Sequence, residues 1–228
     1  MSIDEVSPDQ VIIWESGILI LNSTIVWTWA ILALLGGTCW LLTRRLSTGA
    51  NVSRRQAFLE IVILGIQKQL QEISQNKPMR GFTFLASLFL FILTANVLSI
   101  VPGYDAPTGS LSTTAALAIC VFFAVPFFGI MSNGFASYFR KYLQPTACML
   151  PFNILGEISR SLALAVRLFG NMMSGAKLVA VLLAIVPLFF PVIMQLLGLL
   201  TGVIQAYIFS VLAAVYIASA VQIQQEGG

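Results

Sequence analysis

The chain consists of long blocks of apolar residues separated by short polar segments. The blocks lack the alternation of apolar and polar positions found in the strands of a membrane barrel, so each block predicts a helix. About 20 apolar residues span the hydrocarbon core of a bilayer, and the blocks reach or exceed that length. We therefore expect membrane-spanning segments at residues 18–42, 82–101, 112–131, 153–186 and 192–224.

A different pattern fills the segment between the first two blocks. Residues 54–77 mix apolar positions such as Phe58 and Ile61 with Arg, Lys, Glu and Gln. This mixture predicts an amphipathic helix that lies on the membrane surface. The expected fold class is an all-α membrane protein with about five transmembrane helices plus one interfacial amphipathic helix, in a single membrane domain over residues 1–228.

The last two blocks are too long for upright membrane spans. Residues 153–186 and 192–224 contain no proline, and Pro187 and Pro191 mark the turn between them. At 1.5 Å per residue each helix would be about 50 Å long, against a hydrocarbon core of about 30 Å. Because nothing inside either block forces a break, we expect a hairpin of two long and strongly tilted helices.

Composition excludes several classes of protein. Of the 228 residues, 58% are hydrophobic and 9% are charged, whereas soluble domains carry about 25% charged residues. A soluble enzyme and a disordered chain are therefore excluded. The sequence has no histidine, no CxxC pair and no GxxxxGK[ST] loop, so we expect no metal site, no bound nucleotide and no cofactor. The net charge of +3 gives no reason to expect nucleic acid as a partner.

Positive charges gather on one side of the predicted spans. Seven of the twelve bases lie between the first and second spans, whereas the acidic N-terminal segment and the loop that holds Asp105 carry none. Since loops rich in Lys and Arg stay in the cytoplasm, the N-terminus is expected outside and the C-terminus in the cytoplasm. The seven bases are Arg44, Arg45, Arg54, Arg55, Lys68, Lys77 and Arg80.

One strong base lies deep within the fifth block. Arg167 is fourteen residues into that block, about 20 Å from its start. A guanidinium at that depth costs about 2.5–3.5 kcal/mol on the insertion scale and stays charged, so Arg167 is a candidate functional residue. It shares one helix face with other polar positions, at spacings of three and four residues. This face carries Glu157, Arg160, Leu164, Arg167, Asn171 and Ser174.

Two interpretations of Arg167 remain open from the residues alone. In the first, Arg167 forms a structural ion pair or reaches the membrane interface because the helix tilts. In the second, it pairs with an acidic group of another subunit. Glu157 lies ten residues away, so the two side chains cannot touch directly. The last block offers only a stripe of small and polar residues, which usually marks a close contact between helices, and Gln205 in that stripe is expected to face Arg167. The stripe consists of Gln195, Gly198, Gly202 and Gln205.

Four motifs resemble the a subunit of F-type ATP synthases. The run SLALAVRLFGNMMSG, residues 161–175, contains the RLFGN core of that family, and GLLTGVIQAYIFSVLAAVYI, residues 198–217, is similar to its last helix. APTGSLSTT at residues 106–114 and PFNILGEISR at residues 151–160 also match in order and spacing. The resemblance covers about residues 80–222, and the earlier part matches only in general layout.

The resemblance implies a stator against which a ring of c subunits rotates, each with a membrane-buried carboxylate. Arg167 would face that carboxylate between two aqueous half-channels for H⁺ or Na⁺, with Asn171, Gln205 and Glu157 along the ion path. The further implied partners are the peripheral-stalk b subunits, the F1 sector through the stalk, and membrane lipid. The chain would be no enzyme by itself and would lie in the bacterial inner membrane.

The sequence departs from the family pattern at several positions. Ala176 followed by Lys177 stands where many members have an acidic residue, and Ser110 stands where members commonly have Asp. We place Ser110, Ser174 and Lys177 on the ion path, with an interfacial anchor as the other interpretation of Lys177. The scarcity of proton-relay groups favours Na⁺ or a proton path made of water, and resembles a divergent, alternate bacterial branch of the family.

Two other functions are compatible with a small helical membrane protein. A stand-alone secondary transporter would show inverted repeats, and the sequence contains no internal repeat. A membrane scaffold or assembly protein would not require the deep charge at Arg167. The coverage of the four motifs therefore favours the a subunit.

Overall fold

The computed structural model describes residues 12–16, 19–43, 64–65, 67–68, 81–101, 103–135, 150–185 and 190–221. Within these ranges, five helices are long and apolar enough to cross a membrane. The predicted all-α membrane class is thereby confirmed, with one short β-hairpin before the first helix. The strands are β1 (Ile12–Ser16) and β2 (Leu19–Asn22), and the helices are α1 (Ser23–Thr43), α3 (Phe82–Val97), α4 (Leu111–Asn133), α6 (Leu150–Ile185) and α7 (Phe190–Val221), with 3₁₀ turns η3 (Leu98–Ile100) and η4 (Pro107–Gly109).

The observed helices lie close to the predicted spans, with one difference at the start of the chain. The first helix begins at Ser23, five residues after the predicted start at residue 18, because Leu19–Asn22 pairs as an antiparallel strand with Ile12–Ser16. The predicted interfacial helix at residues 54–77 lies outside the described residues, apart from positions 64–65 and 67–68, which are helical.

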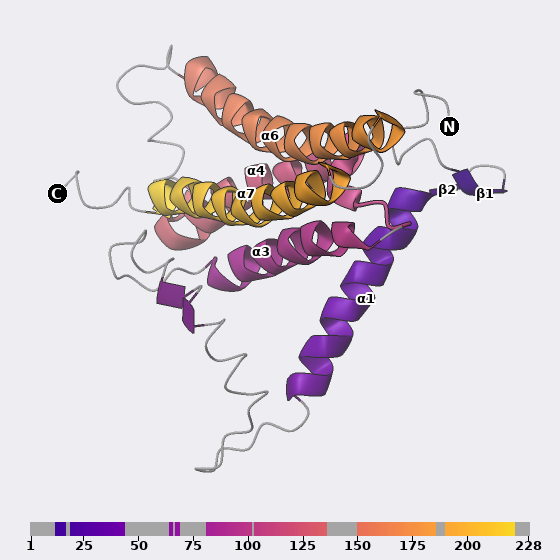
Figure 1. Ribbon diagram of the computed structural model, residues 1–228. Coiled ribbons are helices and arrows are strands. Elements are labelled where there is room, and N and C mark those ends of the chain that lie inside the picture. The colour runs from indigo at the N-terminus through magenta and orange to yellow at the C-terminus, as the bar shows by residue number, and fades with distance from the viewer. Residues whose placement is uncertain are drawn as a thin grey trace.

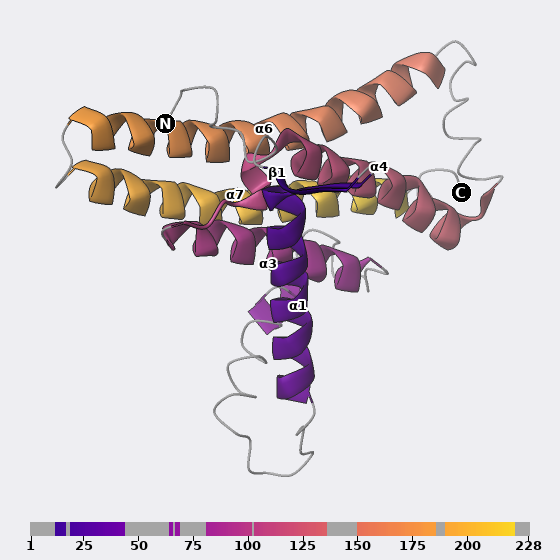
Figure 2. The same ribbon diagram turned by 90° about the vertical axis from the view of Figure 1, so that its right-hand side faces the viewer.

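Four helices pack together and the fifth crosses them steeply. Figures 1 and 2 show α3, α4, α6 and α7 in one bundle, with α1 at a large angle to α6 and α7. With 36 and 32 residues, α6 and α7 are longer than an upright helix needs to cross a hydrocarbon core about 30 Å thick, and their strong tilt in a bilayer stays a prediction. Most of α1 is exposed and apolar, including Trp29 and Trp40.

The core of the bundle is built largely from α3 and α7, with contributions from α4 and α6. Side chains at helical spacing on α3, such as Leu85 and Ile92, are fully buried. The facing side of α7 alternates small residues with larger ones, so the two helices can approach closely. Phe209 and Ile217 are fully buried there. By contrast, much of the apolar surface of α6 is exposed, which leaves a face for lipid or another subunit.

The loop between α3 and α4 is fastened at three points. The Tyr104 hydroxyl donates to the Ala95 carbonyl oxygen (3.2 Å), and the Tyr104 ring packs edge-to-face with Trp27 on α1, with 4.9 Å between centroids. The buried Ser110 caps α4, since its Oγ accepts from the Thr113 amide. The loop is therefore held against both α1 and α3.

Candidate functional site

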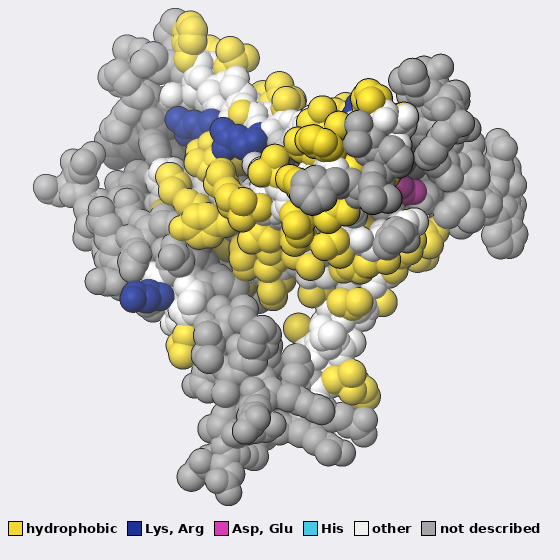
Figure 3. Space-filling view, viewed as in Figure 1, with side chains coloured by type: hydrophobic (Ala, Val, Ile, Leu, Met, Phe, Trp, Pro, Cys, Tyr) yellow, Lys and Arg dark blue, Asp and Glu magenta, His cyan; other side chains and the backbone are white. Residues whose placement is uncertain are grey.

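Arg167 lies on the unbroken helix α6, between two buried leucines. Leu164 and Leu168 are 1% and 0% exposed and pack into the bundle, whereas the Arg167 side chain is exposed. No ion pair or hydrogen bond joins the Arg167 guanidinium to any residue in the described ranges. Basic side chains of α6 stand in a largely hydrophobic surface (Figure 3). Arg167 is thus a charge without a described counterion on an apolar face.

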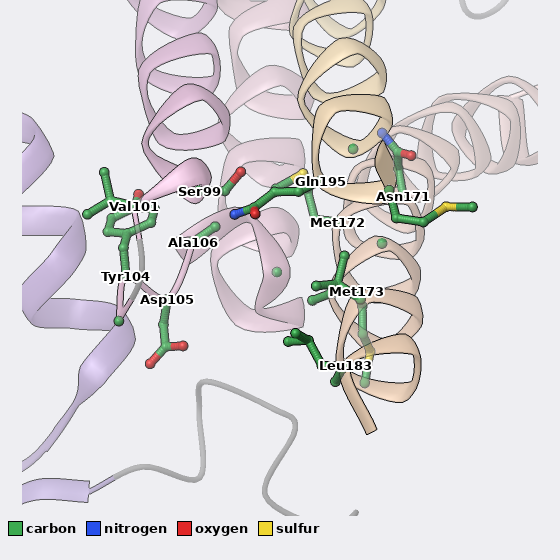
Figure 4. A pocket seen from close by; sticks show the side chains of 18 residues that line it. Ser99, Val101, Tyr104, Asp105, Ala106, Asn171, Met172, Met173, Leu183 and Gln195 are labelled. Carbon is green, nitrogen blue, oxygen red and sulfur yellow. The ribbon is translucent and has the colours of Figure 1, made fainter. Parts of the chain in front are cut away.

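A half-open cavity of about 360 Å³ lies between the α3–α4 loop, α6 and α7. The loop contributes Tyr104 and Asp105, α6 contributes Asn171, and α7 contributes Gln195 and Gly198 (Figure 4). The Gln195 amide donates to the Ile100 carbonyl oxygen (3.3 Å). Since the lining carries an amide from each long helix and the volume holds several water molecules, the cavity can hydrate a small cation.

A second, much smaller cavity lies near the other end of α6. It has about 20 Å³, which is room for one water molecule. Its polar lining includes Glu157 and Arg160 of α6 and Tyr216 and Ser219 of α7. The guanidinium carbon of Arg160 stands 5.7 Å from the centroid of the Tyr216 ring, within the range of a cation–π contact.

The two cavities bracket Arg167 along α6. Arg167 lies seven residues beyond Arg160 of the small cavity and four residues before Asn171 of the large one. Arg160 lies beside Tyr216 of α7, and Asn171 shares the large cavity with Gly198 of α7. The two helices run antiparallel side by side (Figure 2) with equal rise per residue, so seven residues after Arg160 corresponds to residue 209 of α7 and four residues before Asn171 corresponds to residue 202. These two estimates place Arg167 level with residues 202–209 of α7. Gln205 falls inside that window.

Gln205 nevertheless points into the bundle. It is 5% exposed, and no partner for its Nε2 lies among the described residues. No hydrogen bond joins Gln205 to Arg167 among the described residues, and the expected face-to-face arrangement of the two side chains stays a prediction. The predicted close helix contact of the small-residue stripe is confirmed at Gly202, where an added Cβ would lie 3.1 Å from the Cβ of Asn96. The partner helix is α3.

The remaining predicted site residues occupy separate places. Ser174 is exposed on α6, and its hydroxyl donates to the Asn171 carbonyl oxygen (3.2 Å). Lys177 is exposed further along α6. Ser110 is fully buried as the cap of α4 and exchanges a 2.6 Å hydrogen bond with Ser112. Their places on an ion path stay predictions.

Sequence reasoning missed three polar residues near the large cavity. Asn96 and Thr108 are fully buried and hydrogen-bonded to each other (2.7 Å). Asp105 lines the cavity and accepts from the Ser23 hydroxyl (3.3 Å). An asparagine inside an apolar block was the available signal at Asn96, because buried polar groups in membranes need partners. Within the described residues no cluster of three or more His, Cys, Asp or Glu could hold a metal ion.

Comparison with known proteins identifies the family. The family model "ATP synthase A chain" matches residues 25–218. ATP synthase subunit a 1 of Chlorobaculum parvum is 57% identical over 220 residues, 96% of this chain and 97% of the relative. ATP synthase subunit a of Albidiferax ferrireducens is 58% identical over 214 residues, 94% of this chain and 93% of the relative. The chain therefore belongs to the ATP synthase A chain family, the a subunits of F-type ATP synthases.

Proposed function

We propose that this chain is the ion-guiding stator of the F0 sector, with Arg167 as the residue that faces the carboxylate of a rotating c-ring. The observation that carries the proposal is the position of Arg167: an exposed guanidinium, without a described partner, lies along α6 between two cavities that each have polar side chains in a mostly apolar lining. An uncompensated charge at membrane depth is costly. A carboxylate from another subunit removes that cost.

The charge of Arg167 would act on the ion carried by the ring. A cation next to a carboxylate favours its ionised form, so the ring carboxylate releases its bound H⁺ or Na⁺ as it passes Arg167. The guanidinium keeps its charge at all working pH values. It therefore also repels a free cation that would cross directly from one cavity to the other. Ions must then travel with the ring, which couples their flow to rotation.

The two cavities would serve as the half-channels. The large cavity, with Asp105, Asn171 and Gln195, admits ions from outside, and the small cavity beside Glu157 connects to the cytoplasm. This assignment follows from the charge asymmetry of the loops, which places the N-terminus outside and the C-terminus in the cytoplasm. One elementary charge crossing 100 mV releases about 2.3 kcal/mol, so several ions are needed per nucleotide.

The assembly around the chain follows from the same proposal. The exposed apolar face of α6 that carries Arg167 would meet the c-ring. The peripheral-stalk b subunits and, through the stalk, the F1 sector would complete the complex in a bacterial inner membrane. The chain itself would perform no catalysis on nucleotides.

Replacement of Arg167 tests the proposal. In the assembled complex, reconstituted in vesicles, Arg167→Ala should abolish ATP-driven ion transport while leaving the complex assembled. Thr38→Ala, on the exposed side of α1, is the control and should transport normally. Retained coupled transport in Arg167→Ala would overturn the proposal. Transport by the chain alone, in vesicles without other subunits, would instead identify a stand-alone transporter.

The identity of the ion has its own test. The described site holds few proton-relay groups, which favours Na⁺ or a proton path made of water. ATP hydrolysis by the complex is measured at alkaline pH with and without added Na⁺. Stimulation by Na⁺ identifies Na⁺ as the ion, and activity independent of Na⁺ identifies protons.

A further inference from the structure

A buried amide joins α3, the α3–α4 loop and α7 at one point. Asn96, at the end of α3, is fully buried. Its Nδ2 donates to the Gly202 carbonyl oxygen of α7 (2.8 Å), and its Oδ1 accepts from the Thr108 hydroxyl in η4 (2.7 Å). Gly202 and Thr108 are also buried. A single side chain therefore connects three elements that lie far apart in the sequence.

The chemistry of this contact requires an amide. A helix carbonyl can only accept, so the donor end of Asn96 faces Gly202, and the remaining oxygen receives the Thr108 hydroxyl. An aspartate would set a carboxylate oxygen against the Gly202 carbonyl, and a leucine would leave the buried Thr108 hydroxyl without this acceptor. Gly202 completes the fit, because any larger residue would press a Cβ to within 3.1 Å of Asn96.

This contact fixes the height and rotation of the part of α7 that carries Gln205. Gln205 follows Gly202 by three residues, which is less than one helical turn, so the two positions share a face. Thr108 belongs to the same loop as Asp105, which lines the large cavity. The Asn96 amide thus ties one wall of that cavity to the helix segment level with Arg167.

We propose that Asn96 is a positioning residue for ion translocation, which acts by holding Gln205 at the depth of Arg167 through its hydrogen bonds to Gly202 and Thr108. The inference rests on the proposed function. It adds Asn96 to the residues of that function, although among the described contacts Asn96 touches neither the large cavity nor Arg167. If α7 slides or turns when this tether is lost, Gln205 leaves its level and coupled transport falls even though the complex assembles.

The test uses the reconstituted complex and compares Asn96→Leu, Gln205→Leu and the double variant. Asn96→Leu should lower ATP-driven ion transport about tenfold, which corresponds to ~1.4 kcal/mol. The double variant should transport no less than Gln205→Leu alone, because Asn96 acts through Gln205. Losses that multiply in the double variant, or normal transport by Asn96→Leu, would overturn the proposal.

A second pair of variants keeps the test valid where Asn96→Leu fails to assemble. Thr108→Val removes the hydroxyl that holds the amide, and Thr108→Ser keeps it. Transport should fall in Thr108→Val and stay near normal in Thr108→Ser; equal transport by the two would contradict the proposal. Ser87→Ala, which removes a local hydroxyl contact on the exposed side of α3, is the matched control.

A third variant changes the α7 side of the contact between Asn96 and Gly202. Gly202→Ala places a Cβ 3.1 Å from the Cβ of Asn96, so Asn96 must shift, and the variant should reproduce the loss of transport. Gly37→Ala, in open space on α1, is its control. The Arg167→Ala complex is measured in the same assay. Normal transport by Arg167→Ala disproves the proposed function itself. Defective transport by Arg167→Ala, combined with normal transport by the Asn96, Thr108 and Gly202 variants, disproves only the positioning role.

Discussion

The guanidinium of Arg160 lies over the ring of Tyr216, with 5.7 Å from its carbon to the ring centroid. This contact fastens the first half of α6 to the last turns of α7, next to the small cavity beside Glu157. Arg167 follows Arg160 by seven residues, about two turns further along α6. The proposed ion path would therefore depend on contacts distant from Arg167.

Tyr216→Leu should loosen the first half of α6. The ring contributes a cation–π contact of about 0.5–1 kcal/mol at an exposed site, and leucine removes it. Hydrogen exchange of the α6 backbone around residues 157–160, measured in the assembled complex, should become faster. Tyr216→Phe keeps the ring and should exchange like the unmodified protein; equal exchange in the Leu and Phe variants would show that the contact does not hold α6.

Gln205→Leu should impair coupling less severely than Arg167→Ala. Gln205 is neutral and its Nε2 has no described partner, so replacement with leucine removes a dipole, costs little stability, and leaves the charge of Arg167 in place. Ion transport per hydrolysed ATP is the measurement, with the amount of assembled complex as the control. A larger defect in Gln205→Leu than in Arg167→Ala would mean that Arg167 is not the central residue.

Asp105→Asn should weaken ion uptake from the outer side. The carboxylate is exposed and lines the large cavity, where it raises the local concentration of cations. We expect the external ion concentration for half-maximal transport to rise about two- to fivefold, with unchanged maximal rate. The shift should shrink at high ionic strength. Asp105→Glu keeps the charge, and a shift of the same size in that variant would argue against an electrostatic role.

The contribution of Tyr104 to holding the α3–α4 loop in place should decline as the pH rises above about 10. Burial raises the pKa of the Tyr104 phenol above its ordinary value. When the loop is detached, the Tyr104 phenol is exposed and ionises at a lower pH than the buried phenol of the folded protein. The stability that the neutral phenol contributes is therefore lost from about pH 10 upward. Thermal unfolding of the complex between pH 9 and 11 measures this. Tyr104→Phe should be less stable at neutral pH by about 1 kcal/mol and should lack the alkaline decline.

The sequence by itself determined the membrane class and five long apolar helices, apart from the start of the first, and it singled out the charge at Arg167. These features depend on local properties: the length of an apolar block, the absence of proline, and the fixed charge of arginine. The strand at Leu19–Asn22 escaped prediction because its apolar residues continue directly into α1, and composition alone does not separate strand from helix there.

Tertiary structure decided which polar residues meet. The sequence paired Gln205 with Arg167 from spacing, whereas in the structure Gln205 is buried and the Arg167 side chain is exposed. The contact between Asn96 and Gly202 joins residues 106 positions apart. Helical periodicity fixes which residues share a face of one helix but carries no information about the rotation of a neighbouring helix. That rotation is set by close packing at a glycine and by the need of buried amides for partners, which only the assembled bundle defines.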